Sequence, residues 1–221
     1  MSLLTIENDI AILNLDDGKA NVVSLAASTA WRAALKDCQD QAKALIITGN
    51  AKMFSAGYDL SVMNSGDEEA ATTMVRNGFE LVYDLYSHPL PTIAACHGHA
   101  LGLGAFILLA CDTRIGAEGD YKIGLPETAG DMPFTPFLVH FLNAELERRF
   151  HKSAALQSQM CSPKTAIEAG FLDHLVAHEQ VDSMAQQAAQ QLMQLPAGHY
   201  NINKQLLRET ALRKMRAALD T

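Results

Sequence analysis

The chain has 221 residues, of which 48% are hydrophobic and 19% charged, and its formal net charge is -8. This composition is typical of one globular domain that can bury a sizeable core. The acidic total argues against a nucleic-acid partner, because binding to a phosphate backbone depends on Lys and Arg. It does not exclude a phosphorylated small molecule, for which a few cations beside one pocket suffice.

The cysteines form no Cys-x-x-Cys pair, so we expect neither a metal site nor a disulfide framework. They are Cys38, Cys96, Cys111 and Cys161. The longest apolar stretch, residues 101–111, contains glycines and is too short to span a bilayer. The first residues show no basic start before an apolar run, as a signal peptide would. We therefore expect a cytoplasmic protein with no membrane partner.

Strand-like and helical patterns alternate over the first 125 residues. The continuous apolar runs are typical of strands buried on both faces. Ser24 is a plausible N-cap of the first helix, and residues 16–19 make a polar turn before it. In chain order we predict strands at 3–7 and 10–15, a helix at 24–37, a strand at 44–48, a loop at 50–60, a helix at 69–87, a strand at 92–96, an apolar helix ending at Cys111, and strands at 113–116 and 121–124. This order predicts an α/β protein with a mainly parallel sheet and crossover helices.

From residue 133 onward the patterns become mainly helical, with one strand-like segment at 173–177. The helices predicted there are residues 134–147, 163–170, 180–195 and 201–219. The sequence has no internal repeat and no low-complexity linker. We therefore expect a core over residues 1–195 and a helical extension over 196–221, packed on that core or on a neighbouring subunit.

Two loops carry the chemical signal. In the first, residues 54–60 (FSAGYDL), small residues let the backbone bend and let a ligand approach, so the N–H after Gly57 can point outward. A surface turn containing glycine would look the same. In the second, glycines 98, 102 and 104 lie between a strand and a helix start, where N–H groups lack intrahelical partners. The spacing fits neither a Rossmann fingerprint nor a P-loop.

Taken together, the two loops suit a thioester. Two converging N–H groups stabilise the negative charge that develops on a carbonyl oxygen when the neighbouring carbon loses a proton.

The segments 54–60, 91–104 (PTIAACHGHALGLG), 110–112 (ACD) and 124–127 (GLPE) resemble successive signatures of the crotonase superfamily, the enoyl-CoA hydratase/isomerase family. Their order and spacing match over roughly residues 5 to 200. The resemblance implies a spiral of ββα units with a helical C-terminal region, and trimers that often pair into hexamers. It implies an acyl-CoA thioester substrate, with coenzyme A entering as part of that substrate and no separate cofactor.

The resemblance also implies the site residues. The N–H donors of the oxyanion hole are those of Tyr58 and Leu103, and Leu103 replaces the usual glycine, so its side chain needs room. Hydratases of the family have a glutamate at the position of Phe106, whereas the second family glutamate is present as Glu127. The residues expected to contact substrate are Ala56, Gly57, Asp59, Leu60, Gly102, Phe106, Pro126 and Phe134.

The loss of one glutamate bears on the reaction. Adding water across a C2=C3 bond uses two carboxylates, whereas moving a double bond from C3 to C2 needs one base. Phe106 would keep the pocket dry and raise the pKa of Glu127. We therefore hypothesise a Δ3-Δ2 enoyl-CoA isomerase with Glu127 as the base. The alternatives are a hydratase or acyl-CoA hydrolase with an acid from elsewhere, and a catalytically silent acyl-CoA binding protein.

Other polar residues are weaker candidates. Asp59 either caps the following helix or borders the pocket, and His97 and His99 have no acidic neighbour in the sequence, so we interpret them as structural. Lys204 and Arg208 lie one turn apart on the last helix, which ordinarily indicates a solvated face. The resemblance leaves a contact between these two side chains and the CoA phosphates open.

Overall fold

The computed structural model describes residues 2–220, and within them nine strands form two sheets. The larger sheet has the strand order β1-β2-β3-β5-β7-β9, and every neighbouring pair except β1–β2 is parallel. Its strands are β1 (Leu4–Glu7), β2 (Ile10–Asn14), β3 (Ala44–Thr48), β5 (Thr92–Cys96), β7 (Thr113–Ala117) and β9 (His174–Val176). The predicted parallel sheet is thereby confirmed.

A second sheet contains three short parallel strands in the order β4-β6-β8. They are β4 (Met53–Ser55), β6 (His99–Leu101) and β8 (Ile123–Gly124). The sequence prediction assigned the first two to loops, which is wrong for these residues. Each of the three strands leads directly into a segment of the candidate site, so this small sheet aligns those segments side by side.

Helices connect the strands and form most of the C-terminal region, as predicted. Ser24 caps the first of them, since its hydroxyl accepts a hydrogen bond from the N–H of Ala27 at 3.1 Å. Asp59 caps the short second helix through the N–H of Ser61, at 2.9 Å. The helices are α1 (Leu25–Cys38), α2 (Leu60–Met63), α3 (Glu68–Tyr86), α4 (Leu103–Ala110), α5 (Pro136–Glu145), α6 (Pro163–Ala169), α7 (Val181–Leu192) and α8 (Ala197–Leu219).

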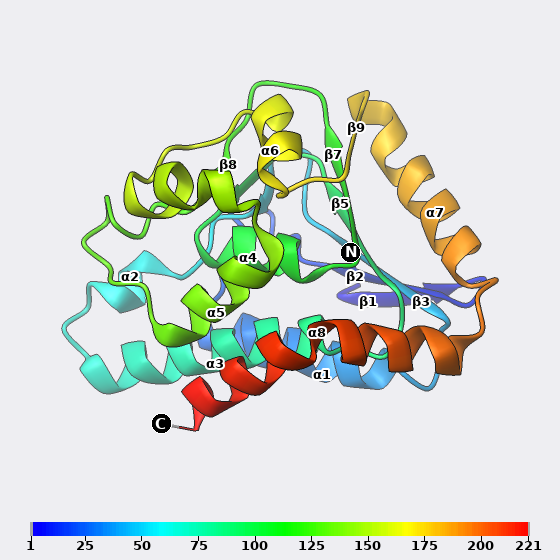
Figure 1. The fold of residues 1–221 in the computed structure, drawn as a ribbon, viewed down its shortest axis with the longest axis horizontal. Helices are drawn as coiled ribbons and strands as arrows, with labels where there is room; N and C mark the ends of the chain where they lie inside the picture. Colours follow the sequence, from blue (N-terminus) through cyan, green and yellow to red (C-terminus); the bar gives the residue numbers. More distant parts are fainter. Residues whose placement is uncertain (1, 221) are drawn as a thin grey trace.

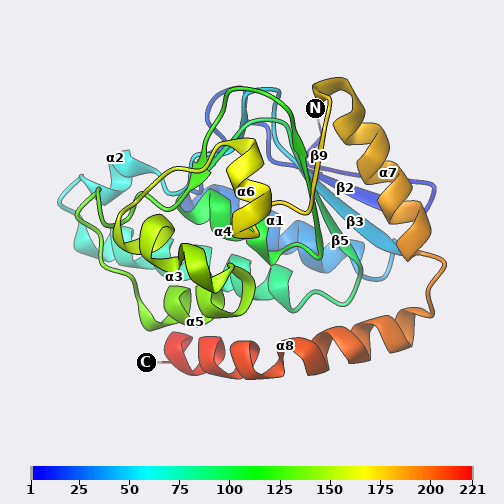
Figure 2. The same ribbon diagram turned by 45° about the horizontal axis from the view of Figure 1, so that its top comes forward.

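The helices cover the large sheet and enclose α4. Helix α7 packs on β3, β5 and β7, away from α3 and α5 (Figures 1 and 2). Helix α3 lies against both α1 and α4, and every residue of α4 is buried. Helix α8 runs across α3 and α5 along one edge of the molecule (Figure 2). No helix within residues 2–220 combines the length and the apolar character needed to cross a membrane.

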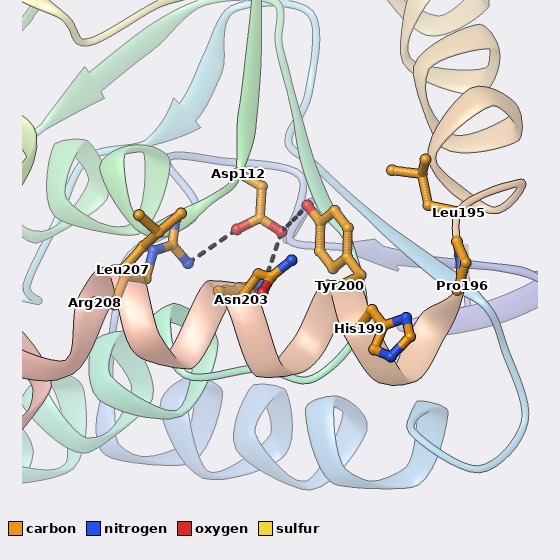
Figure 3. Close-up of a pocket in the computed structure, with 9 residues that line it drawn as sticks. Asp112, Leu195, Pro196, His199, Tyr200, Asn203, Leu207 and Arg208 are labelled. Atoms are coloured by element: carbon orange, nitrogen blue, oxygen red, sulfur yellow. Dashed lines mark hydrogen bonds and ion pairs between the residues drawn. The ribbon is translucent and has the colours of Figure 1, made fainter.

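Asp112, just after α4, fixes α8 to the rest of the chain. Its carboxylate lies 2.7 Å from Lys204 Nζ and 2.9 Å from Arg208 Nη1, and it accepts a hydrogen bond from the Tyr200 hydroxyl at 3.0 Å (Figure 3). The Lys204 side chain is only 5% exposed. The interpretation of Lys204 and Arg208 as a solvated face is therefore wrong, because both cations turn inward to an acid whose side chain is only 10% exposed.

The four cysteines, His97 and His99 lie outside the candidate site. All four cysteines are free and buried. His97 does have an acidic neighbour, contrary to the sequence expectation: its Nε2 lies 3.2 Å from Asp182 Oδ1 on α7. His99 accepts a hydrogen bond from the N–H of Lys122. Both contacts join elements distant in the sequence, in keeping with structural roles.

Candidate active site

The first loop leaves β4 and is held tightly by its neighbours. Gly57 has φ +82°, a conformation that favours glycine. Its carbonyl accepts a hydrogen bond from the N–H of Val23, and its N–H lies 3.2 Å from the hydroxyl of Ser55. Within residues 2–220, no acceptor pairs with the next backbone donor, the N–H of Tyr58. The loop therefore presents one fixed, free N–H.

Asn21 braces this loop and was missed in the sequence analysis. It is fully buried, with φ +52°, and its side-chain amide donates to the carbonyls of Met53 and Phe54. Its own carbonyl accepts from the Ser55 hydroxyl at 2.8 Å. Asparagine tolerates this left-handed conformation better than most residues, but the sequence alone does not reveal which strand its side chain reaches.

The second loop runs from β6 into α4. Gly102 has φ +52° and ψ -126°, and its N–H donates to the carbonyl of Gly124 at 3.0 Å. Leu103 is the first residue of α4, so its N–H has no intrahelical acceptor, and no other acceptor within residues 2–220 replaces it. The start of α4 is thus a second free donor.

The two loops touch through their backbones. A Cβ added to Gly57 would lie 2.7 Å from the carbonyl oxygen of Leu101 and 3.1 Å from the nitrogen of Leu103. No side chain fits at residue 57, so the chain that carries the Tyr58 N–H passes directly beside the N–H of Leu103. The structure therefore brings the two predicted donor residues together.

Glu127 lies beside this junction. A Cβ added to Gly102 would be 3.6 Å from Glu127 Oε1 and 4.0 Å from Pro126 Cδ. The Glu127 loop is fixed by hydrogen bonds from the Met132 N–H to the Glu127 carbonyl and from the Gly130 N–H to the Pro126 carbonyl. Three separate segments, which end in Tyr58, Leu103 and Glu127, thus meet around Gly102.

The environment of the Glu127 carboxyl group is unusually dry. The residue is 7% exposed, and its Oε2 is buried without a hydrogen-bond partner within residues 2–220. Burial raises the pKa of Glu127 to about 7, against the hydrogen bond from its own N–H. An acid with this pKa exchanges protons readily near neutral pH.

Aromatic side chains pack against Tyr58, and a second aromatic pair lies in the core. The Tyr58 hydroxyl donates to the Val75 carbonyl at 2.7 Å, and its ring lies edge-on to Phe79 at 6.4 Å. Burial raises the pKa of Tyr58 well above its ordinary value, and the nearby Glu127 charge adds to this, so the phenol stays neutral. Phe106 is fully buried, 6.0 Å from the ring of Phe141.

The other residues that were predicted to contact the substrate differ in burial. Ala56 flanks Gly57 in the first loop, where its N–H donates to the Ala20 carbonyl, and Phe134 is partly buried against the hydrophobic core. Asp59 serves as the N-cap of α2, and Leu60, at 59% exposure, faces outward. These two residues end the first loop, where α2 begins.

The comparisons with known proteins agree on one family. The family model for enoyl-CoA hydratase/isomerase matches residues 5–221. A crystal structure of a probable enoyl-CoA hydratase from Mycobacterium tuberculosis superposes with a TM-score of 0.94 and 36% identity, over 98% of this chain and 92% of that one. A second structure of the same Mycobacterium tuberculosis protein, described there as an enoyl-CoA isomerase, gives a TM-score of 0.92 and 35% identity, over 98% of this chain and 95% of that one.

A probable enoyl-CoA hydratase from Bacillus subtilis is 36% identical over 128 residues, which are 56% of this chain and 49% of that protein. The matched part of the chain thus spans about half the length of the curated relatives.

Proposed function

Because the chain belongs to the enoyl-CoA hydratase/isomerase family and has the crotonase fold, we propose that it moves the double bond of a 3-enoyl-CoA thioester to position 2. The observation that carries this proposal is a single buried carboxyl group, Glu127, beside two free backbone donors. The position at which hydratases of the family have a second glutamate is Phe106, which is fully buried.

In this proposal the thioester oxygen binds the N–H groups of Tyr58 and Leu103. Negative charge grows on that oxygen when C2 loses its proton, and donors that are already oriented stabilise it without reorganisation. Loss of one such donor typically costs about 3 kcal/mol in the transition state. The close approach of Gly57 to Leu103 supports the pairing of the two donors.

Glu127 carries the proton in this proposal. Its carboxylate removes a proton from C2, and the electron pair of the C–H bond passes into a dienolate held at the two donors. The protonated Glu127 then delivers the proton to C4, which leaves the new double bond between C2 and C3. The reaction needs no water and no second acid, in keeping with the fully buried Phe106.

A hydratase is the second candidate, because the similar Bacillus subtilis protein is described as a probable hydratase and the similar Mycobacterium tuberculosis protein is described both as a probable hydratase and as an isomerase. It requires an acid that holds water at C3, and the rise in the pKa of Glu127 comes from burial rather than from a neighbouring carboxylate. A catalytically silent acyl-CoA binding protein is the third candidate. A protein that kept the oxyanion hole but lost catalytic activity would have the same backbone geometry.

Parallel assays of 3-enoyl-CoA isomerisation and crotonyl-CoA hydration test the proposal. We expect isomerisation to exceed hydration by at least about a hundredfold, the size of a typical general acid–base contribution. Comparable rates would favour the hydratase, and tight binding of both thioesters without turnover of either would favour the binding protein.

The proposal predicts a specific pH dependence. Because Glu127 must be ionised to accept the C2 proton, kcat/KM for isomerisation should rise about tenfold per pH unit at low pH and level off above pH about 7. A series of initial rates between pH 5 and about 9 measures this profile. A profile that is already level between pH 5 and about 7, as expected for the ordinary glutamate pKa of 4.5, would contradict the dry environment described above.

A further inference from the structure

Gly78 lies in the middle of α3, a position at which glycine weakens a helix relative to alanine. The residue is buried and faces the two residues that carry the free backbone donors. A Cβ added to Gly78 would lie 2.5 Å from the phenol oxygen of Tyr58 and 2.7 Å from Cδ2 of Leu103. Both side chains therefore occupy the space that residue 78 leaves empty.

The two side chains anchor their own backbones at this point. The Tyr58 phenol donates to the Val75 carbonyl, about one turn before Gly78 on the same helix. Leu103 is the first residue of α4, and α3 packs along α4. The two residues that carry the donor N–H groups, Tyr58 and Leu103, thus each have a side chain in contact with the same short stretch of α3.

We infer that Gly78 is a positioning residue of the active site, which sets the spacing of the Tyr58 and Leu103 donors by receiving both side chains. The inference explains how leucine fits at residue 103: the missing side chain on α3 supplies the room that the larger one on α4 needs. It rests on the proposed function, because the spacing of the donors matters to catalysis only if they bind the thioester oxygen.

The substitution Gly78→Ala tests the inference. An added methyl group displaces the side chains of Tyr58 and Leu103 from α3, so kcat for isomerisation should fall at least about tenfold, with a smaller change in KM, because the donors act mainly in the transition state. Adding Leu103→Gly to this variant removes one of the two conflicts and should recover part of kcat. The matched control is Gly198→Ala in α8, where a Cβ would meet nothing within 4 Å and kcat should stay unchanged.

Thermal unfolding provides a readout that is independent of turnover. A helical glycine with free space gains stability on replacement by alanine, so Gly198→Ala should hold or raise Tm. Gly78→Ala should lower Tm, and Leu103→Gly should restore part of the loss. A rise in Tm for Gly78→Ala overturns the inference. If that variant does not fold, a triple variant that adds Tyr58→Ala and Leu103→Gly removes both conflicts. Folding of the triple variant supports the contacts, and its failure to fold overturns the inference.

Binding of acetoacetyl-CoA separates this inference from the proposed function. The enolate of this β-keto thioester absorbs in the near ultraviolet, so the fraction of bound enolate reports directly on the two donors. A wild-type protein that neither isomerises 3-enoyl-CoA nor forms the bound enolate refutes the proposed function, and with it a positioning role in catalysis. A Gly78→Ala variant that folds and keeps both kcat and the bound enolate refutes the positioning role alone.

Discussion

Replacing Glu127 by glutamine should abolish isomerisation and at the same time make the folded protein more stable above pH about 7. Glutamine retains the size of the side chain but cannot accept and return a proton. A general base typically contributes about 100- to 10,000-fold, so kcat should fall by about a thousandfold or more. Binding of a CoA thioester should change little, because the donors at Tyr58 and Leu103 remain.

The gain in stability follows from the sign of the pKa shift. Burial raises the pKa of Glu127 from 4.5 to about 7, so the folded state binds more protons than the unfolded state between these values. Stability is therefore lost as the pH rises from about 4.5 to about 7, by a total on the order of 3 kcal/mol. Glu127→Gln removes this loss, so its advantage in stability should be present at pH 8 and small at pH 4.

Denaturant unfolding at the two pH values, together with the isomerase assay, measures both effects. Glu147→Gln is the matched control, because Glu147 is exposed and the same substitution there removes the same charge. Full isomerase activity in Glu127→Gln would refute the role of this residue. An unchanged stability at pH 8 would show that the carboxylate is better solvated than its burial implies.

The fold was predictable where a strand is buried on both faces. Residues 44–48 and 92–96 are continuous apolar runs, and they form β3 and β5 with these bounds. Residues 53–55 and 99–101 form strands through pairing with one another and with β8. These strands are three residues long or shorter, and their partners are far away in the sequence, so no local pattern indicates them.

The site was predictable only as far as the resemblance reaches. It pointed to Tyr58, Leu103 and Glu127, and the structure brings these three together around Gly102. Gly78 carried a weak local signal, since it lies inside the predicted helix at residues 69–87, where glycine costs stability, but that signal identifies neither its burial nor its contacts. The prediction for Lys204 and Arg208 was wrong because their spacing describes one helix and does not reveal Asp112, which precedes Lys204 by 92 residues.

Replacing Asp112 by alanine should destabilise the protein more than any other change at a charged residue considered above. The carboxylate accepts hydrogen bonds from the Thr92 N–H and from Tyr200, and it neutralises Lys204 and Arg208. Burial already lowers the pKa of Lys204, against the attraction of Asp112. Removal of the acid therefore leaves a buried ammonium group uncompensated, at a cost of about 3–5 kcal/mol.

In denaturant unfolding, Asp112→Ala should thus show a large fall in the denaturant concentration at the midpoint. The control Glu168→Ala breaks an exposed ion pair with Arg149 and should change the free energy of unfolding by less than about 1 kcal/mol. Adding Lys204→Met to Asp112→Ala should recover part of the loss, because an apolar chain of similar length fills the site without a charge. A recovery of stability in the double variant would show that the loss comes from the buried, unpaired charge of Lys204. If Asp112→Ala behaves like Glu168→Ala, the hydrogen bonds to the Leu90 and Tyr86 carbonyls suffice to hold Lys204 and Arg208, and α8 is fixed by its packing on α3 and α5.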